Sequence, residues 1–326
     1  MKSKILEILR NKDTYVSGQE LSERFGVSRT AVWKAIHQLE EEGYRIEAVP
    51  RKGYHMVETP DVVCKEEILS LLETKWAGRN LVYLETVDST NDLAKKLADQ
   101  GAPEGTLVVA DEQTGGKGRR GRAWCTPKGI AIAMTIVLRP DIRPELASMV
   151  TLVMGLSVAK AIGSLYPVSV GIKWPNDVVV NGKKICGILT EMSAEMTGIH
   201  YLVIGTGINT NVEEFPEEIQ SVATSLIKEL GEKVNRAELI AACLKYFEEY
   251  YEKYIAAGNL APLKEDYEAL LLNRNNKVRV LEPNHEYTGL SLGINEDGEL
   301  LVEKEDGTVT AVYAGEVSVR GVYGYV

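Results

Sequence analysis

The sequence has little of what marks a secreted or membrane-spanning protein. Its four cysteines, Cys64, Cys125, Cys186 and Cys243, have neither CxxC spacing nor a histidine close by, which excludes a disulfide framework and a zinc site and predicts reduced thiols. No segment approaches the roughly 18 unbroken apolar residues of a membrane span. The first residues, 1–7, lack the apolar core of a signal peptide. We therefore expect a cytoplasmic protein without membrane contact.

Charge is also unevenly distributed along the 326 residues, a length sufficient for two or three domains. The formal net charge of -10 argues against a chain that coats nucleic acid with its whole surface. Residues 1–60 hold ten Lys and Arg against nine Asp and Glu, whereas residues 61–326 hold 27 (37 minus 10) against 38 (47 minus 9). Any contact with DNA is therefore expected in the first 60 residues.

Two helices separated by a glycine turn are predicted near the N-terminus. Ser17 and Glu20 form a capping box that starts a short helix, and Gly26 can end it in a left-handed conformation. Ser28 caps a second helix from Arg29 to about residue 42. Its apolar stripe comprises Val32, Ala35, Ile36 and Leu39. This is the layout of a helix-turn-helix, whose second helix enters the major groove.

Residues 44–49 and 53–57 predict two strands around a basic tip, 50–52, which is typical of the wing in a winged helix-turn-helix. The alternative is a small helical protein-interaction domain with solvated charges. The turn length, the amphipathic second helix and the basic tip together favour DNA binding. The predicted DNA-contacting residues are Ser28, Arg29, Thr30, Trp33, Lys34, His37, Arg51 and Lys52.

A glycine- and arginine-rich segment, 115–122, follows a predicted strand at 107–110. Its glycines allow backbone N–H groups close to an anion, and its cations can neutralise phosphate or carboxylate. The segment fits neither the P-loop pattern nor the dinucleotide-binding pattern. By itself it is equally consistent with a flexible basic loop.

A β-hairpin is predicted around Asn181-Gly182, because Asn-Gly between two β-rich runs strongly favours such a turn. Asp177 and Lys184 should then lie on paired strands. Lys184 alternates in phase with Cys186 and Ile188, so we expect it to point inward. The alternative is an edge-strand lysine that prevents aggregation.

Other segments carry weaker signals. The glycines in 204–211 imply close approach of a ligand or another segment at a strand end. Ser89 and Asp92 have the spacing of a helix cap, and capping is the simpler interpretation. Residues 213–275 look helical, with Asn235 as the cap of a helix from Arg236 to about residue 254. Short strands at 277–281, 287–294, 300–303, 309–314 and 317–323 predict a small β-barrel.

The segments Ser89-Thr90-Asn91, GKGRRGRxW, KWPND, KKICGILTE and GTGINTN, in this order, resemble the biotin protein ligase family. The helix-turn-helix further resembles its bifunctional branch, the biotin operon repressors. The resemblance covers essentially the whole chain. One position departs from the family pattern, since Lys117 replaces the usual arginine and so keeps the charge without a bidentate guanidinium.

The resemblance implies a multidomain α+β fold. Its parts would be a winged helix-turn-helix at 1–62, a central mixed or antiparallel sheet with flanking helices at 63–275, as in class II synthetase-like ligase cores, and an SH3-like β-barrel at 276–326. Lys184 and Arg119 would be catalytic. Biotin would contact Ser89, Thr90, Asn91, Gln113, Lys117, Gly118, Arg119, Lys184 and Gly187. The adenylate would contact Arg119, Arg120, Arg122, Trp124, Lys173, Asp177 and Asn209.

The resemblance also implies an activity: biotin is activated with ATP to biotinyl-5'-AMP and transferred to a lysine of a biotin carboxyl carrier protein, that of acetyl-CoA carboxylase. Mg²⁺ would accompany ATP without a named protein ligand. The adenylate would act as corepressor for a homodimer on the operator DNA of biotin genes. The alternatives are a catalytically inactive biotin-sensing repressor and a lipoate or octanoate ligase.

Overall fold

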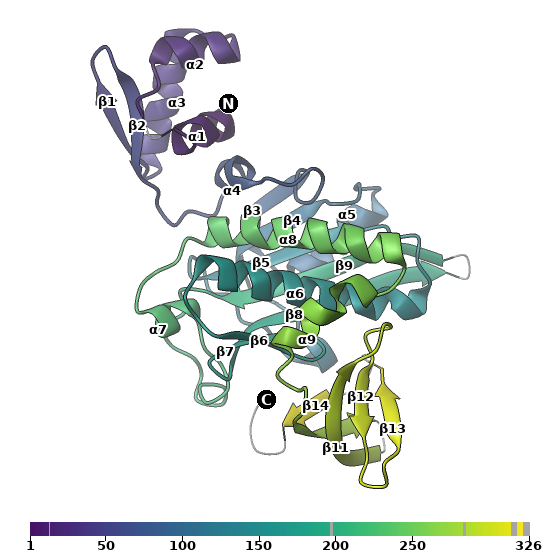
Figure 1. Cartoon of the computed structure of the whole chain (residues 1–326). Coiled ribbons are helices and arrows are strands. Elements are labelled where there is room, and N and C mark those ends of the chain that lie inside the picture. The colour runs from purple at the N-terminus through teal and green to yellow at the C-terminus, as the bar shows by residue number, and fades with distance from the viewer. Residues whose placement is uncertain (13, 196–197, 283–284, 314–317, 322–326) are drawn as a thin grey trace. The chain divides into compact units, whose positions relative to one another are not determined.

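The computed structural model describes the chain except residues 13, 196–197, 283–284, 314–317 and 322–326 (Figure 1). The chain divides into two compact units. The first comprises Met1–Leu72 with Asn235–Ala241, and the second comprises Glu73–Val234 with Ala242–Val326.

The first unit contains the predicted helix-turn-helix and wing. Its elements are α1 (Lys2–Arg10), α2 (Gly18–Phe25), α3 (Arg29–Glu41), β1 (Arg45–Val49), β2 (Gly53–Glu58) and α4 (Lys65–Leu71). Both predicted caps are confirmed: Ser17 accepts the N–H of Glu20 at 3.0 Å, and Ser28 accepts that of Ala31 at 3.2 Å. The reciprocal half of the capping box is not formed, because the Glu20 carboxylate binds Lys12 at 2.5 Å instead.

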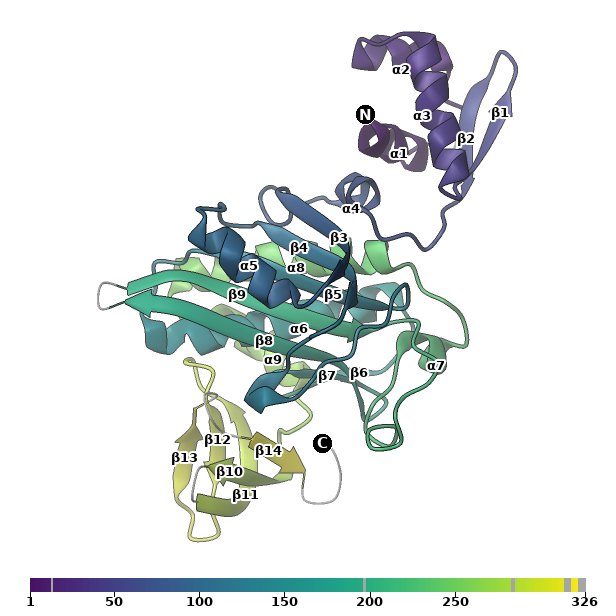
Figure 2. The same ribbon diagram turned by 180° about the vertical axis from the view of Figure 1, so that it is seen from behind.

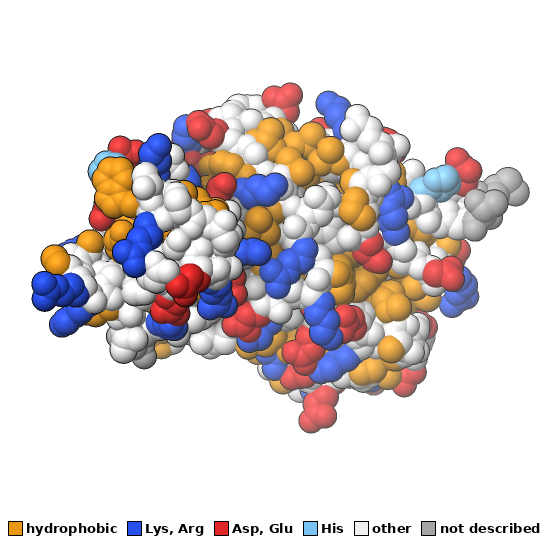
Figure 3. Space-filling model, turned by 90° about the horizontal axis from the view of Figure 1, so that it is seen from above, with side chains coloured by type: hydrophobic (Ala, Val, Ile, Leu, Met, Phe, Trp, Pro, Cys, Tyr) orange, Lys and Arg blue, Asp and Glu red, His pale blue; other side chains and the backbone are white. Residues whose placement is uncertain are grey.

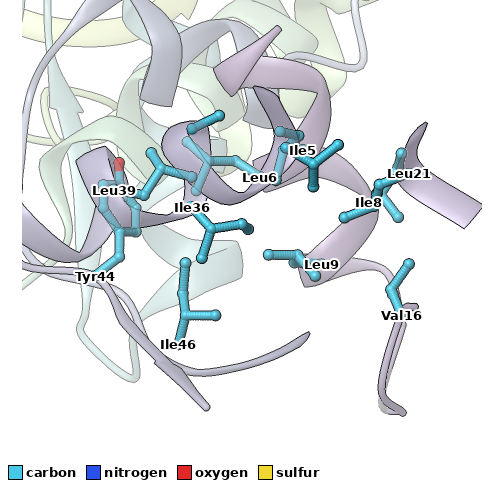
Figure 4. Close-up of a cluster of buried hydrophobic side chains, with 12 residues drawn as sticks. Ile5, Leu6, Ile8, Leu9, Val16, Leu21, Ile36, Leu39, Tyr44 and Ile46 are labelled. Atoms are coloured by element: carbon cyan, nitrogen blue, oxygen red, sulfur yellow. The ribbon is translucent and has the colours of Figure 1, made fainter. Parts of the chain in front are cut away.

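One apolar cluster holds this unit together (Figure 4). The predicted stripe of α3 is buried in it, and α1, which the sequence analysis did not identify, covers that stripe. The buried members are Ile5, Leu6, Ile8, Leu9, Val16, Leu21, Val32, Ala35, Ile36, Leu39, Tyr44 and Ile46. The opposite face of α3 is therefore free to be exposed, as an amphipathic recognition helix requires.

A buried carboxylate joins α4 to the same unit. Glu67 is fully buried and receives hydrogen bonds from Arg10 Nη2 at 2.7 Å and from the Tyr44 hydroxyl at 2.6 Å. Desolvation raises the pKa of Glu67 above its usual value, although both partners oppose that shift. The stability of the unit therefore depends on both hydrogen-bonding partners staying in place.

Replacing Arg10 with methionine is expected to lower the free energy of unfolding of this unit by about 3 kcal/mol, because it leaves a buried carboxylate without its cation. Because the pKa of Glu67 is higher in the folded unit than in the unfolded chain, the free energy of unfolding falls as the pH rises from the ordinary carboxyl pKa to the raised pKa of Glu67. Arg10 opposes this rise, so its loss raises the pKa of Glu67 further. Thermal unfolding across pH 4–8 measures both effects. The control is Lys2→Met, which removes the exposed pair with Glu42 and should cost less than about 1 kcal/mol.

The second unit is built on a seven-stranded sheet, and the mixed or antiparallel sheet that the resemblance implies is confirmed as a mixed one. The strands are β3 (Leu81–Val87), β4 (Leu107–Gln113), β5 (Ala131–Leu138), β6 (Val170–Lys173), β7 (Asp177–Val180), β8 (Lys183–Glu195) and β9 (Gly198–Asn209), in the order β3-β4-β5-β9-β8-β7-β6. Among the described strands of this sheet, only β3 and β4 pair in parallel. Helix α5 (Thr90–Asp99) covers one face and α6 (Ala147–Leu165) covers the other (Figures 1 and 2).

Helix α6 with the turn before it, Pro144–Leu165, is long and apolar enough to cross a membrane by length and composition. Counting unbroken apolar runs missed this helix, because single polar residues interrupt it. In the structure 72% of its most apolar window is buried, since the helix packs on strands β6 and β8. Its apolar character is accounted for by its place in the core.

The helices within residues 213–275 agree with the sequence predictions in part. Asn235 caps α8 (Arg236–Ala257) by accepting the N–H of Glu238 at 3.1 Å. Within 213–275 the other helices are α7 (Leu226–Leu230) and α9 (Lys264–Leu270), with a short 3-10 turn at Ala261–Leu263, so the prediction of continuous helix was too broad.

A small antiparallel sheet follows α9. It has the order β13-β12-β11-β10-β14, formed by β10 (Lys277–Glu282), β11 (His285–Ile294), β12 (Leu300–Glu303), β13 (Val309–Val312) and β14 (Ser318–Gly321). Positions 314, 317 and 322–323 of the predicted strands lie outside the described residues. The indole of Trp174 donates to the carbonyl of Gly298 at 2.9 Å, which ties this sheet to the larger one.

Candidate active site

A cavity opens beside the start of α5. The start of α5, the end of β4, the glycine-arginine loop (residues 115–122) and strands β8 and β9 all contribute to its wall. It is lined by Ser89, Thr90, Asn91, Gln113, Lys117, Gly118, Arg119, Trp124, Asn176, Lys184, Gly187, Ile188, Leu189, Gly205, Thr206 and Gly207. All residues predicted to contact biotin therefore come together here.

The start of α5 is organised around the cavity rather than around a cap. Ser89 occupies the capping position and is buried, but its side chain makes no cap hydrogen bond, so simple capping was the wrong interpretation. Instead, the backbone N–H and the hydroxyl of Thr90 both donate to Gln113 Oε1, at 2.9 and 3.0 Å. Gln113 in turn donates to Thr126 at 3.0 Å, which fixes the orientation of its amide.

Asn91 connects α5 to the sheet beneath it. Its Oδ1 accepts from Thr135 at 2.7 Å, and its Nδ2 donates to Glu191 at 2.7 Å. A Cβ at Gly205 would lie 2.1 Å from this Oδ1, so the position has room only for glycine. The predicted close approach at 204–211 is thus made, in part, by another segment of the chain.

The glycine-arginine loop is a narrow hairpin. Lys117 and Ala123 form an isolated antiparallel bridge, and the N–H of Gly118 donates to the carbonyl of Arg122 at 2.7 Å. At the tip, Arg119 donates to Asn176 Oδ1 at 2.8 Å. Burial lowers the pKa of the Arg119 guanidinium, which indicates a partly desolvated cation that will gain from a bound anion.

Lys117, the residue that departs from the family pattern, is engaged by a carboxylate. Its ammonium lies 2.6 Å from Asp92 on α5, and Lys95 lies 3.0 Å from the same residue and 2.8 Å from Glu191. The hydrogen bond from Lys117 is the main cause that holds the pKa of Asp92 below its usual value. Lys117 therefore attaches the loop to α5.

Replacing Asp92 with asparagine is expected to shorten the lifetime of a bound adenylate by about twofold to fourfold, because half-exposed ion pairs contribute up to about 1 kcal/mol. Rapid-dilution release of a stable adenylate analogue measures that lifetime. Asp99→Asn, at the other end of α5, is the control. An Asp92→Asn lifetime equal to wild type at low salt would contradict this role.

A β-bulge in β8 turns Lys184 toward the cavity. The prediction that Lys184 points inward is therefore confirmed, but the reason given for it, alternation in phase with Cys186 and Ile188, was wrong. Val178 pairs with Cys186, but the next residue, Val179, pairs with Lys184, which leaves Ile185 as the extra residue. A bulge of this kind redirects the side chains on either side of it. Lys184 is consequently out of phase with Cys186, which is fully buried on the opposite face.

The bulge places Lys184 on the cavity side. A Cβ at Gly187 would lie 3.2 Å from its Nζ, and Nζ lies 5.5 Å from the centre of the Trp124 ring. The Lys184 Nζ forms an ion pair with Asp177 Oδ1 at 2.6 Å. The site therefore presents a partly buried cation, oriented by one carboxylate, next to an aromatic ring.

Trp124 closes one side of the cavity by packing on backbone. A Cβ at Gly207 would lie 2.2 Å from its Nε1, and one at Gly187 would lie 2.9 Å from its ring. Its Nε1 and the hydroxyl of Thr206 are buried without a hydrogen-bond partner among the described residues. Because buried polar atoms are rarely left unpaired, these two atoms are suited to contact a polar ligand.

Residues 83–209 match the biotin/lipoate A/B protein ligase family, residues 2–55 an HTH domain, and residues 275–320 the biotin protein ligase C terminal domain. The chain is 41% identical over 305 residues to the bifunctional ligase/repressor BirA of Bacillus subtilis strain 168, covering 93% of each. The chain belongs to the BirA family. The BirA of Escherichia coli K12 is 31% identical over 318 residues, 97% of this chain and 96% of that one.

Solved structures related to the BirA family support the same assignment for the second unit. The biotin protein ligase of Aquifex aeolicus in complex with biotin and ATP superposes with a TM-score of 0.66 at 34% identity, covering 74% of this chain and 99% of that one. The apo structure of the same ligase gives a TM-score of 0.62 at 31% identity.

Some residues predicted for the adenylate lie outside this cavity of the BirA-family chain. Arg120 lines an adjoining hollow, which shares Arg119, Asn176, Ile188 and Leu189 with the cavity. Lys173 and Asn209 are buried and Arg122 is exposed, and none of the three lines the cavity or the hollow. Asp177 lines neither of them and contacts Lys184 instead. The roles of these residues remain predictions. Among the described residues no group of three or more His, Cys, Asp or Glu could hold a metal ion.

The sequence analysis did not assign Asn176, Ile188, Leu189, Gly205, Thr206 and Gly207 to the cavity. Asn176 lies within the KWPND segment and the others within two further quoted segments, so their positions carried a signal. Which side chains face the cavity depends on strand phase and on the bulge in β8, and neither can be taken from spacing alone.

The first unit of this BirA-family chain carries the predicted DNA-contacting residues on one surface. Ser28, Arg29, Thr30, Trp33, Lys34 and His37 are exposed at and along α3, and Arg51 and Lys52 are exposed at the wing. A groove runs between α3 and the wing. In Figure 3, Lys and Arg side chains gather at the left end of the molecule, the side on which Figure 1 shows the hairpin β1–β2.

Proposed function

We propose that this BirA-family protein joins biotin to AMP, transfers the biotin to a lysine of a biotin carboxyl carrier protein, and represses biotin genes by binding their operator with the adenylate as corepressor. The observation that carries the enzymatic half is the convergence of Lys184 and Arg119 on a cavity with unpaired polar atoms at Trp124 and Thr206. ATP, with its Mg²⁺, and biotin are the substrates.

In the first step a biotin carboxylate oxygen attacks the α-phosphorus of ATP, and the bond to pyrophosphate breaks. Negative charge grows on the phosphate oxygens, so the reaction requires positioned cations rather than a nucleophilic side chain. Lys184, oriented by Asp177, and Arg119, oriented by Asn176, supply such cations. Ser89, Thr90 and Gln113 are assigned to the ureido ring of biotin.

In the second step the carrier lysine amine attacks the carbonyl of the mixed anhydride, AMP leaves, and the amine loses a proton. The adjoining hollow supports this assignment, because it meets the cavity at Arg119 and Asn176 and is open to solvent. An extended lysine side chain could enter from there without passing Trp124. A cytoplasmic location agrees with a carrier substrate of this kind.

Pyrophosphate release from ATP without an acceptor protein tests the enzymatic half. A biotin-dependent burst of about one equivalent per protein is expected, because the adenylate should stay bound. Lipoate is the control acid, and a burst with lipoate alone would replace the substrate while keeping the chemistry. No burst with either acid would indicate a sensing repressor without ligase activity.

Operator binding tests the regulatory half. A non-hydrolysable adenylate is expected to tighten binding of a homodimer to operator DNA, measured by fluorescence anisotropy with sedimentation. Arg51→Ala, in the exposed wing, should weaken that binding by about tenfold at moderate salt and leave pyrophosphate release unchanged. Lys253→Ala, an exposed lysine of α8 paired with Glu249, is the matched control. Equal loss of both activities in Arg51→Ala would contradict the assignment.

A further inference from the structure

The exposed face of α3 carries an aromatic pair that its cations do not explain. Trp33 is 54% exposed, unusually high for a tryptophan, and its ring stacks on His37 with centroids 5.4 Å apart and planes at 14°. The His37 Nδ1 lies 3.3 Å from Glu40, and its Nε2 lies 3.7 Å from Glu41. The two carboxylates hold the imidazole ring of His37 in position. The imidazole in turn holds the indole of Trp33 in place by stacking on it.

Trp33 also lines the groove between α3 and the wing. Cations flank it there, with Arg29 on the same helix and Arg51 and Lys52 on the wing, and no acidic residue lines the described groove. Arg29 is itself oriented by Gln19, which accepts from its Nε at 2.6 Å. An aromatic ring surrounded by positive charge fits a polyanion that carries apolar groups between its phosphates.

Duplex DNA provides one such apolar group in its major groove, the C5 methyl of thymine. Indole donates one hydrogen bond through Nε1–H and cannot accept any. The rest of its exposed ring is apolar, and the apolar partner that the groove offers this part of the ring is the thymine methyl. We propose that Trp33 determines specificity by packing on a thymine methyl in the operator, with His37 as its positioning residue. This inference rests on the proposed DNA-binding function.

The test replaces each operator thymine in turn with deoxyuridine, which removes only the methyl. Wild-type protein, bound to the adenylate analogue, is expected to lose about fourfold in affinity at one position per half-site, the value of one buried methyl. Trp33→Ala should bind more weakly and show no such loss at that position. His37→Ala should show a reduced loss, because the indole is no longer held.

Lys34→Ala is the matched control, because Lys34 is the next exposed residue on α3. It should weaken binding to every duplex and keep the deoxyuridine effect. Unchanged melting temperature confirms that the variants fold. Equal deoxyuridine effects in wild type and Trp33→Ala, or no sensitive thymine in wild type, would overturn the inference while operator binding stands. Failure of wild type to bind any duplex would overturn the DNA-binding function and the inference together.

Discussion

Replacing Lys184 with methionine is expected to slow biotin-dependent pyrophosphate release by about 10²–10³-fold, the usual loss on removing one group that stabilises transition-state charge. Methionine keeps most of the side-chain volume, so Trp124 and Gly187 keep their neighbour. The ammonium that Asp177 orients at 2.6 Å disappears, and with it the charge that we propose faces the α-phosphate. Single-turnover kinetics at saturating ATP and biotin measure the chemical step directly.

The neighbouring lysine provides a close control. Lys183 lies on the same strand and is exposed, whereas Lys184 is partly buried at the cavity. Lys183→Met removes the same charge from the chain and should retain near wild-type rates. If Lys184→Met released pyrophosphate as fast as Lys183→Met, the proposed mechanism would be wrong, although the family assignment would stand.

Replacing Gly207 with alanine is expected to reduce biotin affinity by about 5- to 150-fold, the range of the roughly 1–3 kcal/mol cost of inserting a methyl group into packed structure. The new Cβ would lie 2.2 Å from Trp124 Nε1, so the indole must leave its place on β9. Trp124 closes the cavity from that side, and its displacement also disturbs the loop that carries Arg119. Isothermal titration with biotin measures the loss.

Gly163→Ala is the matched glycine control for that experiment. Gly163 lies in α6, and a Cβ there would meet nothing within 4 Å, so biotin affinity should not change. Alanine in a helix should even stabilise the fold slightly. Biotin affinity in Gly207→Ala that equals that of Gly163→Ala would show that Trp124 does not close the biotin site.

Local signals were sufficient for much of the fold. The caps at Ser17, Ser28 and Asn235, and the hairpin at Asn181-Gly182, appear as predicted because each depends on residues a few positions apart. Prediction failed where a competing partner was available. Glu20 binds Lys12 rather than closing its capping box, and Ser89 faces the cavity rather than capping α5.

In the candidate site, too, local signals predicted some features and failed for others. Its segments could be found from their composition, because glycines beside cations mark backbone that approaches an anion. Their mutual arrangement could not. The β-bulge that redirects Lys184 inserts one residue into β8, and nothing in the local alternation of that strand indicates where the insertion occurs.

By itself, the sequence determined that this protein has a helix-turn-helix with a wing, a hairpin around Asn181-Gly182, a cation-rich loop and a terminal set of short strands. Periodicity, caps and turns are short-range properties of the chain. Only the tertiary structure decided that Lys117 binds Asp92, that Trp124 rests on Gly207, and that Lys184 faces the cavity. Those contacts join residues far apart in sequence, and packing and register, rather than local preference, select among the partners available to each.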